Sequence, residues 1–317
     1  MPEWLREEGI GETRYALVDG DRILAARIAP EGMRRAGEVV RGRLAAVRPR
    51  ALAKLEDGTE VLLAARPAGV SEGARITIEI TRPALPGPEP WKRALGRAVS
   101  ADVAPVSDAV EATDLPFPPA GRDRLSEAGW DDLLAEADTG RIAFVGGELL
   151  VALTPAMTVI DVDGWLKPGE LAVAGAAAAG AAIRRLDLQG SIGIDLPSTP
   201  GKDARQAAAA ALDATLAGEA FERTAVNGFG FLQVVRPRRR PSLLELAHDA
   251  SAFAARALLR RAARDHGPAR LAVNPRVAAV FERHSGWLAA LGRQRGGAIT
   301  LRSDPALAIS GGHAEPV

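Results

Sequence analysis

The feature that most constrains the fold is an alternation of short apolar runs with longer helical stretches after residue 126. Apolar runs bounded by Gly or Pro have the length of buried strands, at 141–144, 148–153, 157–163 and 191–195. Two more apolar runs follow at 221–226 and 231–235. Two alanine-rich stretches have helical length, at 171–186 and 203–217. Strands that alternate with helices predict an α/β layer with a mixed sheet.

The first 100 residues show a different pattern, in which short strand-like runs are separated by turns. Asp19-Gly20-Asp21 and Asp57-Gly58 are typical turn sequences between such runs. Several short strands at close spacing predict a small barrel or a partly open sheet. The chain as a whole is therefore expected to mix α/β and α+β architecture.

Proline content divides the chain further. Prolines are frequent from Pro83 to Pro119, which is typical of a linker. The tail after Ser251 has the pattern helix, strand, helix, strand, which predicts a small α/β unit. We expect N-terminal strands and a barrel, a Pro-rich linker, a mixed-sheet domain and a small C-terminal α/β subdomain, at 1–100, 101–125, 126–245 and 246–317.

Composition excludes several kinds of site and location. The 317 residues contain no cysteine, which excludes disulfides, thiolate zinc sites and cysteine nucleophiles. No apolar stretch approaches the roughly 20 residues needed to span a bilayer. The N-terminal residues also lack the apolar core of a signal peptide. We therefore expect a cytoplasmic protein that does not bind a membrane.

Charge is balanced over the whole chain but not along it. Lysine plus arginine and aspartate plus glutamate number 40 each. Two stretches are locally basic: Arg34, Arg35, Arg41, Arg43, Arg48, Arg50 and Lys54 in the first, and Arg236, Arg238, Arg239 and Arg240 in the second. Such clusters fit phosphate binding, and they equally fit solvated arginines on an exposed surface.

Two apolar strands end in aspartate. Asp161 and Asp163 close the run that begins at Thr158, and Asp195 closes the run that begins at Ser191, after one intervening helix. A strand–helix–strand unit can place such ends side by side, with the strands about 4.8 Å apart. Two carboxylates at that separation repel each other unless a cation bridges them, and Mg²⁺ prefers oxygen ligands. The alternative is structural, because an aspartate after a strand is often a helix N-cap or a turn residue.

Several motifs resemble those of one enzyme family. Thr-Val-Ile-Asp-Val-Asp at 158–163 and Gln-Gly-Ser-Ile-Gly-Ile-Asp at 189–195 resemble the two metal-binding strands of the ribonuclease E/G family. Phe-Gly-Phe-Leu-Gln-Val-Val-Arg-Pro-Arg at 229–238 is similar to another motif of that family, and 12–17 resembles its opening strand. The matches follow the family's order over most of the chain. The resemblance implies an OB-type RNA-binding barrel near 38–97 and an RNase H-like domain that holds the metal.

The resemblance also implies roles for individual residues. The family's catalytic metal ligands fall on Asp161 and Asp195, with Asp163 as a third oxygen donor. Mg²⁺ is the expected ion, and Mn²⁺ could replace it. The residues expected to contact single-stranded RNA are Arg236 and Arg238 near the cut, Lys92 on the barrel, and Arg41 and Arg43, which would guide the strand by charge.

The chain departs from the family at several places. The family's segment that recognises a 5′-monophosphate has no counterpart in the Pro-rich stretch, and its zinc-linking C-x-x-C is missing near 245–251. Two glutamates of the family fall on Pro155 and Gln233. The barrel has no phenylalanine between Arg34 and Arg93, so base stacking, worth about 1–3 kcal/mol per base, would be weak there. We expect no structural zinc, and any oligomer would not be zinc-linked.

Two functions from different classes follow from these observations. The first is a Mg²⁺-dependent endoribonuclease that cuts single-stranded RNA. The second is a catalytically degenerate RNA-binding or partner-binding protein on the same fold. The strand-end aspartates favour the enzyme, whereas Pro155, Gln233 and the barrel without phenylalanine favour the binding protein.

Overall fold

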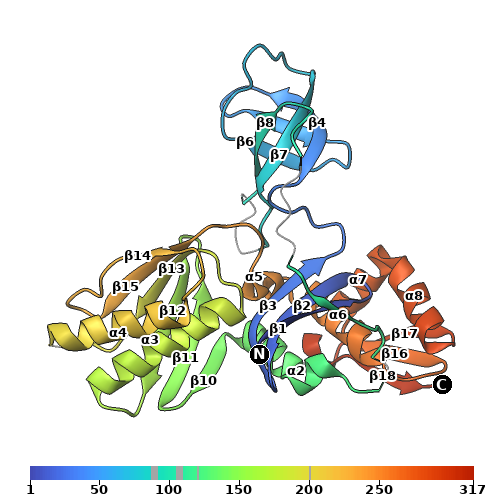
Figure 1. The fold of residues 1–317 in the computed structure, drawn as a ribbon. Coiled ribbons are helices and arrows are strands. Elements are labelled where there is room, and N and C mark those ends of the chain that lie inside the picture. The colour runs from blue at the N-terminus through green and yellow to red at the C-terminus, as the bar shows by residue number, and fades with distance from the viewer. Residues whose placement is uncertain (87–91, 105–109, 120, 200) are drawn as a thin grey trace.

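A computed structural model shows a mixed α/β fold with a closed β-barrel and several mixed sheets (Figure 1). The structure describes residues 1–86, 92–104, 110–119, 121–199 and 201–317. The expected combination of a barrel with α/β layers is confirmed at this level. In the part of the chain that the structure describes, no helix is both long and apolar enough to cross a membrane.

The N-terminal strands form a four-stranded sheet that is separate from the barrel. β1 pairs antiparallel with β2, which also pairs antiparallel with β3. After the barrel, β9 pairs in parallel with β1. These strands span Glu3–Glu8, Glu12–Asp19, Arg22–Pro30 and Thr113–Leu115. Part of the expected linker 101–125 is thus a strand, β9. It forms there because the edge of β1 offers backbone groups to which β9 can pair.

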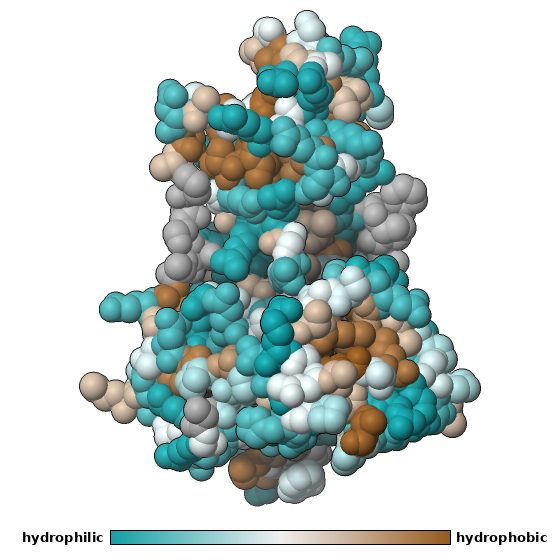
Figure 2. Space-filling view, turned by 90° about the vertical axis from the view of Figure 1, so that its right-hand side faces the viewer, coloured by the Kyte–Doolittle hydropathy of each residue, from teal (hydrophilic) through white to brown (hydrophobic). Residues whose placement is uncertain are grey.

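Residues 39–99 contain the closed five-stranded barrel. Its strand order is β4-β5-β6-β8-β7, and β7 pairs back onto β4. The strands span Val39–Ala46, Leu52–Leu55, Glu60–Leu63, Arg75–Arg82 and Ala94–Val99. Leu44, Ile78 and Ile80 are fully buried inside the barrel. The barrel forms a lobe above the rest of the molecule in Figure 1, and it is the upper part of the surface in Figure 2.

The second half of the chain builds the expected mixed sheet, in the order β10-β11-β12-β13-β15-β14. In that order the strands span Arg141–Phe144, Gly147–Leu153, Thr158–Gly164, Gly190–Asp195, Phe231–Arg236 and Glu222–Arg223. Helices α3 (Pro168–Arg185) and α4 (Lys202–Thr215) lie on one face of this sheet (Figure 1). The alanine-rich α3 packs closely, because a Cβ at Gly175 would overlap Val162 and one at Gly180 would overlap Thr215.

The C-terminal unit packs helices on a three-stranded sheet of order β17-β16-β18. Its strands span Ile299–Ser303, Ala269–Val273 and His313–Pro316, and its helices α6, α7, α8 and η1 span Ala250–Ala262, Pro275–Arg283, Ser285–Arg295 and Ile309–Gly311. The preceding helix α5 (Leu243–His248) buries its leucines in the core shared by the N-terminal and mixed sheets. The second helix expected in the tail forms as two helices that meet at His284, whose φ of −120° and ψ of 54° are not helical. Two short helices, α1 (Arg124–Glu127) and α2 (Trp130–Thr139), precede the mixed sheet.

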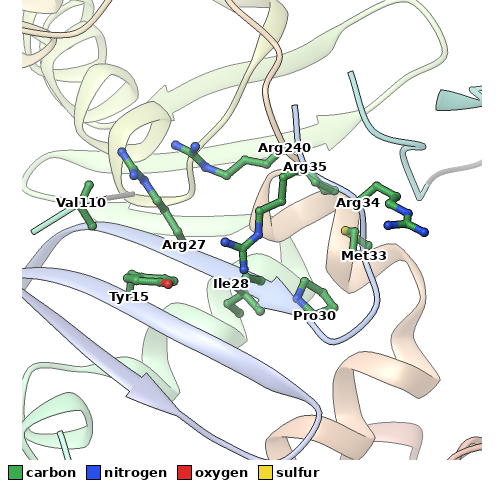
Figure 3. A pocket seen from close by; sticks show the side chains of 11 residues that line it. Tyr15, Arg27, Ile28, Pro30, Met33, Arg34, Arg35, Val110 and Arg240 are labelled. Carbon is green, nitrogen blue, oxygen red and sulfur yellow. The ribbon is translucent and has the colours of Figure 1, made fainter. Parts of the chain in front are cut away.

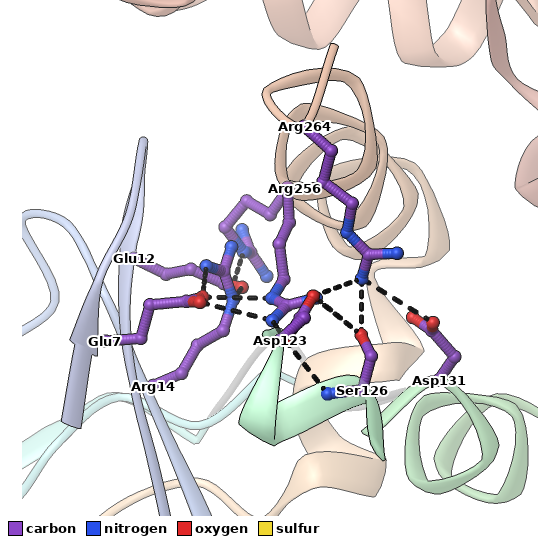
Figure 4. Close-up of polar contacts among 9 residues, drawn as sticks. Glu7, Glu12, Arg14, Asp123, Ser126, Asp131, Arg256 and Arg264 are labelled. Atoms are coloured by element: carbon purple, nitrogen blue, oxygen red, sulfur yellow. Dashed lines mark hydrogen bonds and ion pairs between the residues drawn. The ribbon is translucent and has the colours of Figure 1, made fainter. Parts of the chain in front are cut away.

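A buried network of charged side chains joins the N-terminal sheet to α6 (Figure 4). Arg14 Nη1 donates to Glu7 Oε1 at 2.7 Å, and Arg260 Nε donates to the same oxygen at 2.9 Å. Glu12 accepts from Arg14 Nε at 2.7 Å and from Arg256 Nε at 2.9 Å. None of these five residues is more than 7% exposed. Because a single buried charge is very unfavourable, each side chain depends on its partners.

Asp123 extends this network to the start of α1, where it is the N-cap. Its Oδ1 accepts from Arg260 Nη2 at 2.7 Å and from the backbone N–H of Ser126 at 3.1 Å. Burial raises the pKa of Asp123, but the hydrogen bonds from Arg260 and Ser126 together outweigh it, so the pKa lies below its ordinary value of 3.8. The carboxylate therefore stabilises the fold fully above that ordinary value, and the contribution is lost as the pH falls through the lowered pKa.

Arg260→Met keeps the apolar stem of the side chain and removes its charge. We expect the free energy of unfolding to fall by about 3–5 kcal/mol, because Glu7 and Asp123 lose a shared buried partner. Denaturant unfolding followed by circular dichroism measures the change. Arg302→Met is the matched control, since Arg302 also bridges two carboxylates, Asp304 and Glu315, but is 40% exposed. Comparable losses in the two variants would contradict a special role for the buried network.

Candidate functional site

Asp161 and Asp195 are cross-strand neighbours. β12 and β13 pair in parallel, in a register that joins Ile160 to Ile194 and Asp161 to Asp195. Paired residues on adjacent strands point to the same face of a sheet, on strands about 4.8 Å apart. The two strand-end aspartates therefore lie side by side, as expected from the sequence. That they bind a metal stays a prediction.

Both carboxylates lie on the face of the sheet away from α3 and α4. Ile160 and Ile194, which alternate with the aspartates, are buried in the core, whereas Asp161 and Asp195 are exposed. Within the described ranges, no hydrogen bond or ion pair joins either carboxylate to another group. Because like charges that face each other across strands destabilise a sheet, the pair favours the binding of a cation.

Asp163 does not join this pair, and the expectation that it supplies a third ligand is not met. It lies two residues further along β12, and its Oδ1 accepts from the backbone N–H of Gly164 at 2.8 Å. Its neighbour across the strands is Glu148, which is ion-paired with Arg141. Among the residues that the structure describes, no three His, Cys, Asp or Glu side chains converge as they would around a metal.

Two carboxylates fit Mg²⁺ better than an ion that needs a complete protein shell. Mg²⁺ is usually bound through one or two carboxylates and completes its octahedron with waters and substrate phosphates. A structural zinc ion instead takes four nitrogen or sulfur ligands, and this chain has no thiol. Asp161 and Asp195 are thus the residues that would hold Mg²⁺ or Mn²⁺.

Arg236 does not reach this face, and the prediction that it binds phosphate beside the aspartates is wrong. Phe231 on β15 is paired with Asp195 and shares its face, so Arg236, five residues further on, points to the opposite face. There the side chain is 9% exposed. It donates to Leu188 O at 2.7 Å and to Glu219 Oε2 at 2.6 Å. Arg236 therefore holds β15 against the helical side of the sheet.

Arg238 and Lys92 line a small hollow near the beginnings of β12 and β13, and not the end where the aspartates lie. Arg238 donates to Glu245 Oε1 at 2.5 Å and to Gln189 O at 3.1 Å. Lys92 Nζ donates to Pro155 O at 3.1 Å, which attaches the barrel to the mixed sheet. Both cations thus contact protein groups beside the sheet, away from the paired aspartates.

The barrel carries a row of basic side chains across three strands. Arg43 on β4 is paired with Arg75 on β7 and with Lys54 on β5. All three are exposed, and together with Arg41 they line an open groove. Arg43 also donates to Gly73 O at 3.0 Å. Directly opposed like charges destabilise a sheet, and a bound polyanion would relieve that repulsion.

Sequence reasoning missed Arg75, because it lies outside the basic stretch that ends at Lys54. Its place beside Arg43 follows only from the pairing of β4 with β7, which are distant in the sequence. The strand pattern could have shown that Arg75 begins a strand, but not which strand lies next to it. Register between distant strands is a tertiary property.

Gln233, where the family has a glutamate, lies on the same face as the aspartates. It is paired with Gly193 on β13, and its Nε2 donates to Ser191 Oγ at 2.7 Å. Gln233 therefore places a neutral amide, already bonded to a neighbouring strand, at the position where the resemblance would align a glutamate.

A separate pocket lies between β2, β3 and the segment that follows β15 (Figure 3). Tyr15 and several aliphatic side chains form part of its wall, and the arginines drawn in Figure 3 extend around it. These arginines make structural contacts: Arg240 is ion-paired with Asp187, and Arg27 lies over the ring of Trp4 at 4.8 Å. The elements of this pocket do not carry the paired aspartates.

No protein-family model matches this chain, and no curated protein matches it in sequence. The resemblance to the ribonuclease E/G family therefore rests on the motifs quoted above. The geometry of the aspartates, the arginines and the barrel is independent of that resemblance.

If Mg²⁺ binds between Asp161 and Asp195, it should raise the thermal stability of the protein. A ligand that binds only the folded state stabilises that state, by about 2.7 kcal/mol when the ligand concentration is a hundred times its Kd. Asp161→Asn should abolish that gain. In EDTA the variant should be at least as stable as the wild type, because one of two opposed charges is gone. Scanning calorimetry in Mg²⁺ and in EDTA measures both effects, with Asp163→Asn as the control that keeps the response. An undiminished gain in Asp161→Asn would rule out this ion site.

Proposed function

We propose that the chain is a Mg²⁺-dependent endoribonuclease that hydrolyses phosphodiester bonds of single-stranded RNA, in RNA processing or decay. The observation that carries the proposal is the register of Asp161 with Asp195 on the uncovered face of the mixed sheet. The motifs shared with the ribonuclease E/G family add the reaction class and the substrate.

In this proposal the barrel is of the OB type and residues 126–245 form an RNase H-like domain. The closed five-stranded order β4-β5-β6-β8-β7 supports the first assignment. OB barrels bind oligonucleotides on the face of their second and third strands and on the loop between the first and second. Here Lys54 lies on the second strand, and Arg48 and Arg50 are exposed in that loop.

The basic row of the barrel (Arg43, Lys54 and Arg75) would supply affinity without sequence preference. Each cation that neutralises a phosphate releases counterions, which favours binding at low salt. The described residues of 39–99 include no aromatic side chain on which a base could stack, and Trp91 lies outside the described residues. The barrel would hold the RNA backbone rather than read its bases.

The residues of the mixed sheet would place the scissile phosphate. Asp161 and Asp195 would hold Mg²⁺, which when bound supplies charge neutralisation and activation of water for attack at phosphorus. Both side chains are exposed, so an RNA strand can approach them without movement of the covering helices. Gln233 on the same face is held by Ser191 and would present its amide oxygen toward the strand.

A second function is RNA or partner binding without cleavage. It is favoured because few charged side chains lie beside the aspartates on their face of the sheet. This face offers two paired carboxylates, with Gln233 in place of an acid, and Arg236 is buried on the other side. The basic row of the barrel would serve such a binding protein equally well. The two functions share a fold and differ in whether bound RNA is cut.

Asp195→Asn separates the two functions, because it keeps the size of the side chain and removes one ligand charge. Wild-type protein should cut labelled single-stranded RNA in Mg²⁺ and not in EDTA. In the variant the rate should fall by orders of magnitude, while RNA affinity changes little or rises, since a negative charge near phosphate is gone. Gel analysis of cleavage and anisotropy of binding give the two quantities.

The control is Asp163→Asn, which changes the same charge outside the pair and should retain most activity. Cleavage that persists in Asp195→Asn would refute the assignment of the site. Wild-type protein that binds RNA without cutting it in Mg²⁺ would select the binding function.

Arg75→Ala tests the basic row of the barrel. Affinity for RNA should fall by a similar factor for every sequence, and the salt dependence should weaken by about 0.7 in logarithmic slope, the value for one phosphate contact on a single strand. Thermal stability should hold or rise, because Arg75 faces the like charge of Arg43. Arg97→Ala, an exposed arginine of the same barrel that is ion-paired with Glu79, is the control. Equal effects of the two substitutions would assign the binding to overall charge rather than to the row.

A further inference from the structure

Few large hydrophobic side chains are exposed in the described structure. Those away from the chain ends gather on the domain that contains the six-stranded sheet. They are Val145, Leu150, Trp165, Phe229 and Val235. All lie on the six-stranded sheet or next to the ends of its strands, and the same sheet carries the paired aspartates. Where exposed apolar groups gather in this way, the aromatic side chains are the usual binding anchors.

The two aromatic members of this set lie at one end of the sheet, beyond the aspartates. Trp165 follows β12, four residues after Asp161. Phe229 precedes β15, two residues before Phe231, the cross-strand neighbour of Asp195. Because β15 runs antiparallel to β13, going backward along β15 leads to the same end as going forward along β12. The two rings therefore flank that end. Their strands lie two spacings, about 9.6 Å, apart, and Trp165 lies four positions and Phe229 two positions beyond the level of the aspartates.

Phe229 is 83% exposed although its backbone is firmly held. Asn227 Oδ1 accepts from the backbone N–H groups of Phe229 at 2.9 Å and Phe231 at 3.0 Å. Ser198 Oγ donates to Phe229 O at 3.0 Å. Gly230, with a φ of +94°, lies so close to Leu196 O that a Cβ would overlap it. The turn is thus fixed to the residue that follows Asp195, and it presents the ring to solvent.

Trp165 is presented in a similar way. Its indole is 79% exposed. Its backbone N–H donates to Gly146 O at 3.1 Å, and a Cβ on the preceding Gly164 would overlap the same carbonyl. The β10–β11 turn therefore fixes the position of Trp165. Fixed backbones hold the two residues at a defined separation, which costs less entropy on binding than mobile turns would.

We propose that Trp165 and Phe229 form an aromatic platform on which unpaired bases of single-stranded RNA stack next to Asp161 and Asp195. This inference rests on the proposed function and adds how the strand is positioned at the carboxylates. The rings are positioning residues, because they act on the bases and not on the phosphate that reacts.

Unpaired bases fit this end of the sheet better than a protein partner does. Without Mg²⁺ the paired carboxylates repel a phosphate backbone, so contacts with the uncharged part of the nucleotide would add affinity directly beside them. Every base has a π-face, so stacking on a ring is strong and tolerant of sequence. A protein interface would use a continuous apolar surface, whereas these two rings are separated by the width of β13.

Charge at the same end can accommodate the phosphates between stacked bases. Lys167 precedes α3 and Lys202 begins α4, and both are exposed. Both helices begin after strands that end beside the aspartates, so these lysines lie at the same end as the two rings. They would attract the backbone while the carboxylates keep it at a distance.

The test uses the full chain with labelled single-stranded RNA in EDTA, where binding is measured without cleavage. Trp165→Leu and Phe229→Leu keep an apolar side chain and remove the ring. Each should weaken binding about 5- to 150-fold, the range for loss of one stacked base. Binding of a ribose-phosphate strand without bases should not change. Trp165→Phe should restore most of the affinity.

Val145→Ala is the matched control, because Val145 is 95% exposed in the turn that fixes Trp165 but has no ring. It should bind RNA as the wild type does. In Mg²⁺ the two leucine variants should raise KM with little change in kcat, as expected for contacts made equally in the ground and transition states. A structural effect on the paired aspartates would lower kcat instead.

The outcomes separate this inference from the proposed function. Unchanged RNA binding in both leucine variants, or an equal loss for strands with and without bases, would overturn the platform. Sedimentation that shows a dimer dispersed by the leucine variants would assign the surface to protein contact. Wild-type protein that neither binds nor cuts RNA would refute the proposed function and the platform together. Base-dependent loss of binding in a wild type that does not cut RNA would support the platform and refute cleavage alone.

Discussion

The buried ion pairs of Glu7 and Glu12 with Arg14, Arg256 and Arg260 are the interaction on which the arrangement of the molecule depends. They join residues near the N-terminus to α6, more than 240 positions later. The barrel leaves this N-terminal sheet after β3 and the chain returns to it as β9. Because the barrel is inserted into the sheet, whatever fixes the sheet also fixes where the barrel is attached. A network of this kind stabilises one arrangement strongly, since a displaced partner would leave a charge buried alone.

In the mixed sheet, unlike the buried network, two charged side chains lie unpaired among the described residues, on an exposed face. On its helical face α3 packs so closely that glycine is required at Gly175 and Gly180, and Arg236 is satisfied by Glu219 and backbone carbonyls. On its other face two carboxylates stand in register without partners in the described chain. Such a pair lowers stability, and a tightly packed helical face can tolerate that loss. Strain concentrated on one exposed face of a rigid sheet is typical of binding and catalytic sites.

Local pattern was enough to predict the strands and the neighbouring aspartates, because strand ends in a β–α–β unit meet at one end of a sheet. The same reasoning failed for Arg236, although the strand pattern could have corrected it. Leu232 and Val234 are apolar at alternate positions, and Arg236 continues that series, so it had to share their buried face. The ion network and Arg75 were beyond such reasoning. Glu12 and Arg14 alternate with Ala16 and Val18 on one face of β2, but nothing local shows that Arg256 and Arg260, far along the chain, are their partners.

The proposed division of labour follows from a conflict of charges. In the proposal, Asp161 and Asp195 would repel the phosphates of an RNA strand wherever Mg²⁺ is not bound, and the arginine expected to compensate them lies on the other side of the sheet. Attraction for the backbone is instead placed on the barrel, where Arg43, Lys54 and Arg75 oppose one another. The barrel in turn lacks rings in its described residues, while Trp165 and Phe229 stand exposed beyond the aspartates. In the proposal the barrel would hold the RNA strand by charge, and the mixed-sheet domain would hold it by its bases. The strand could then reach the carboxylates although neither domain makes both kinds of contact.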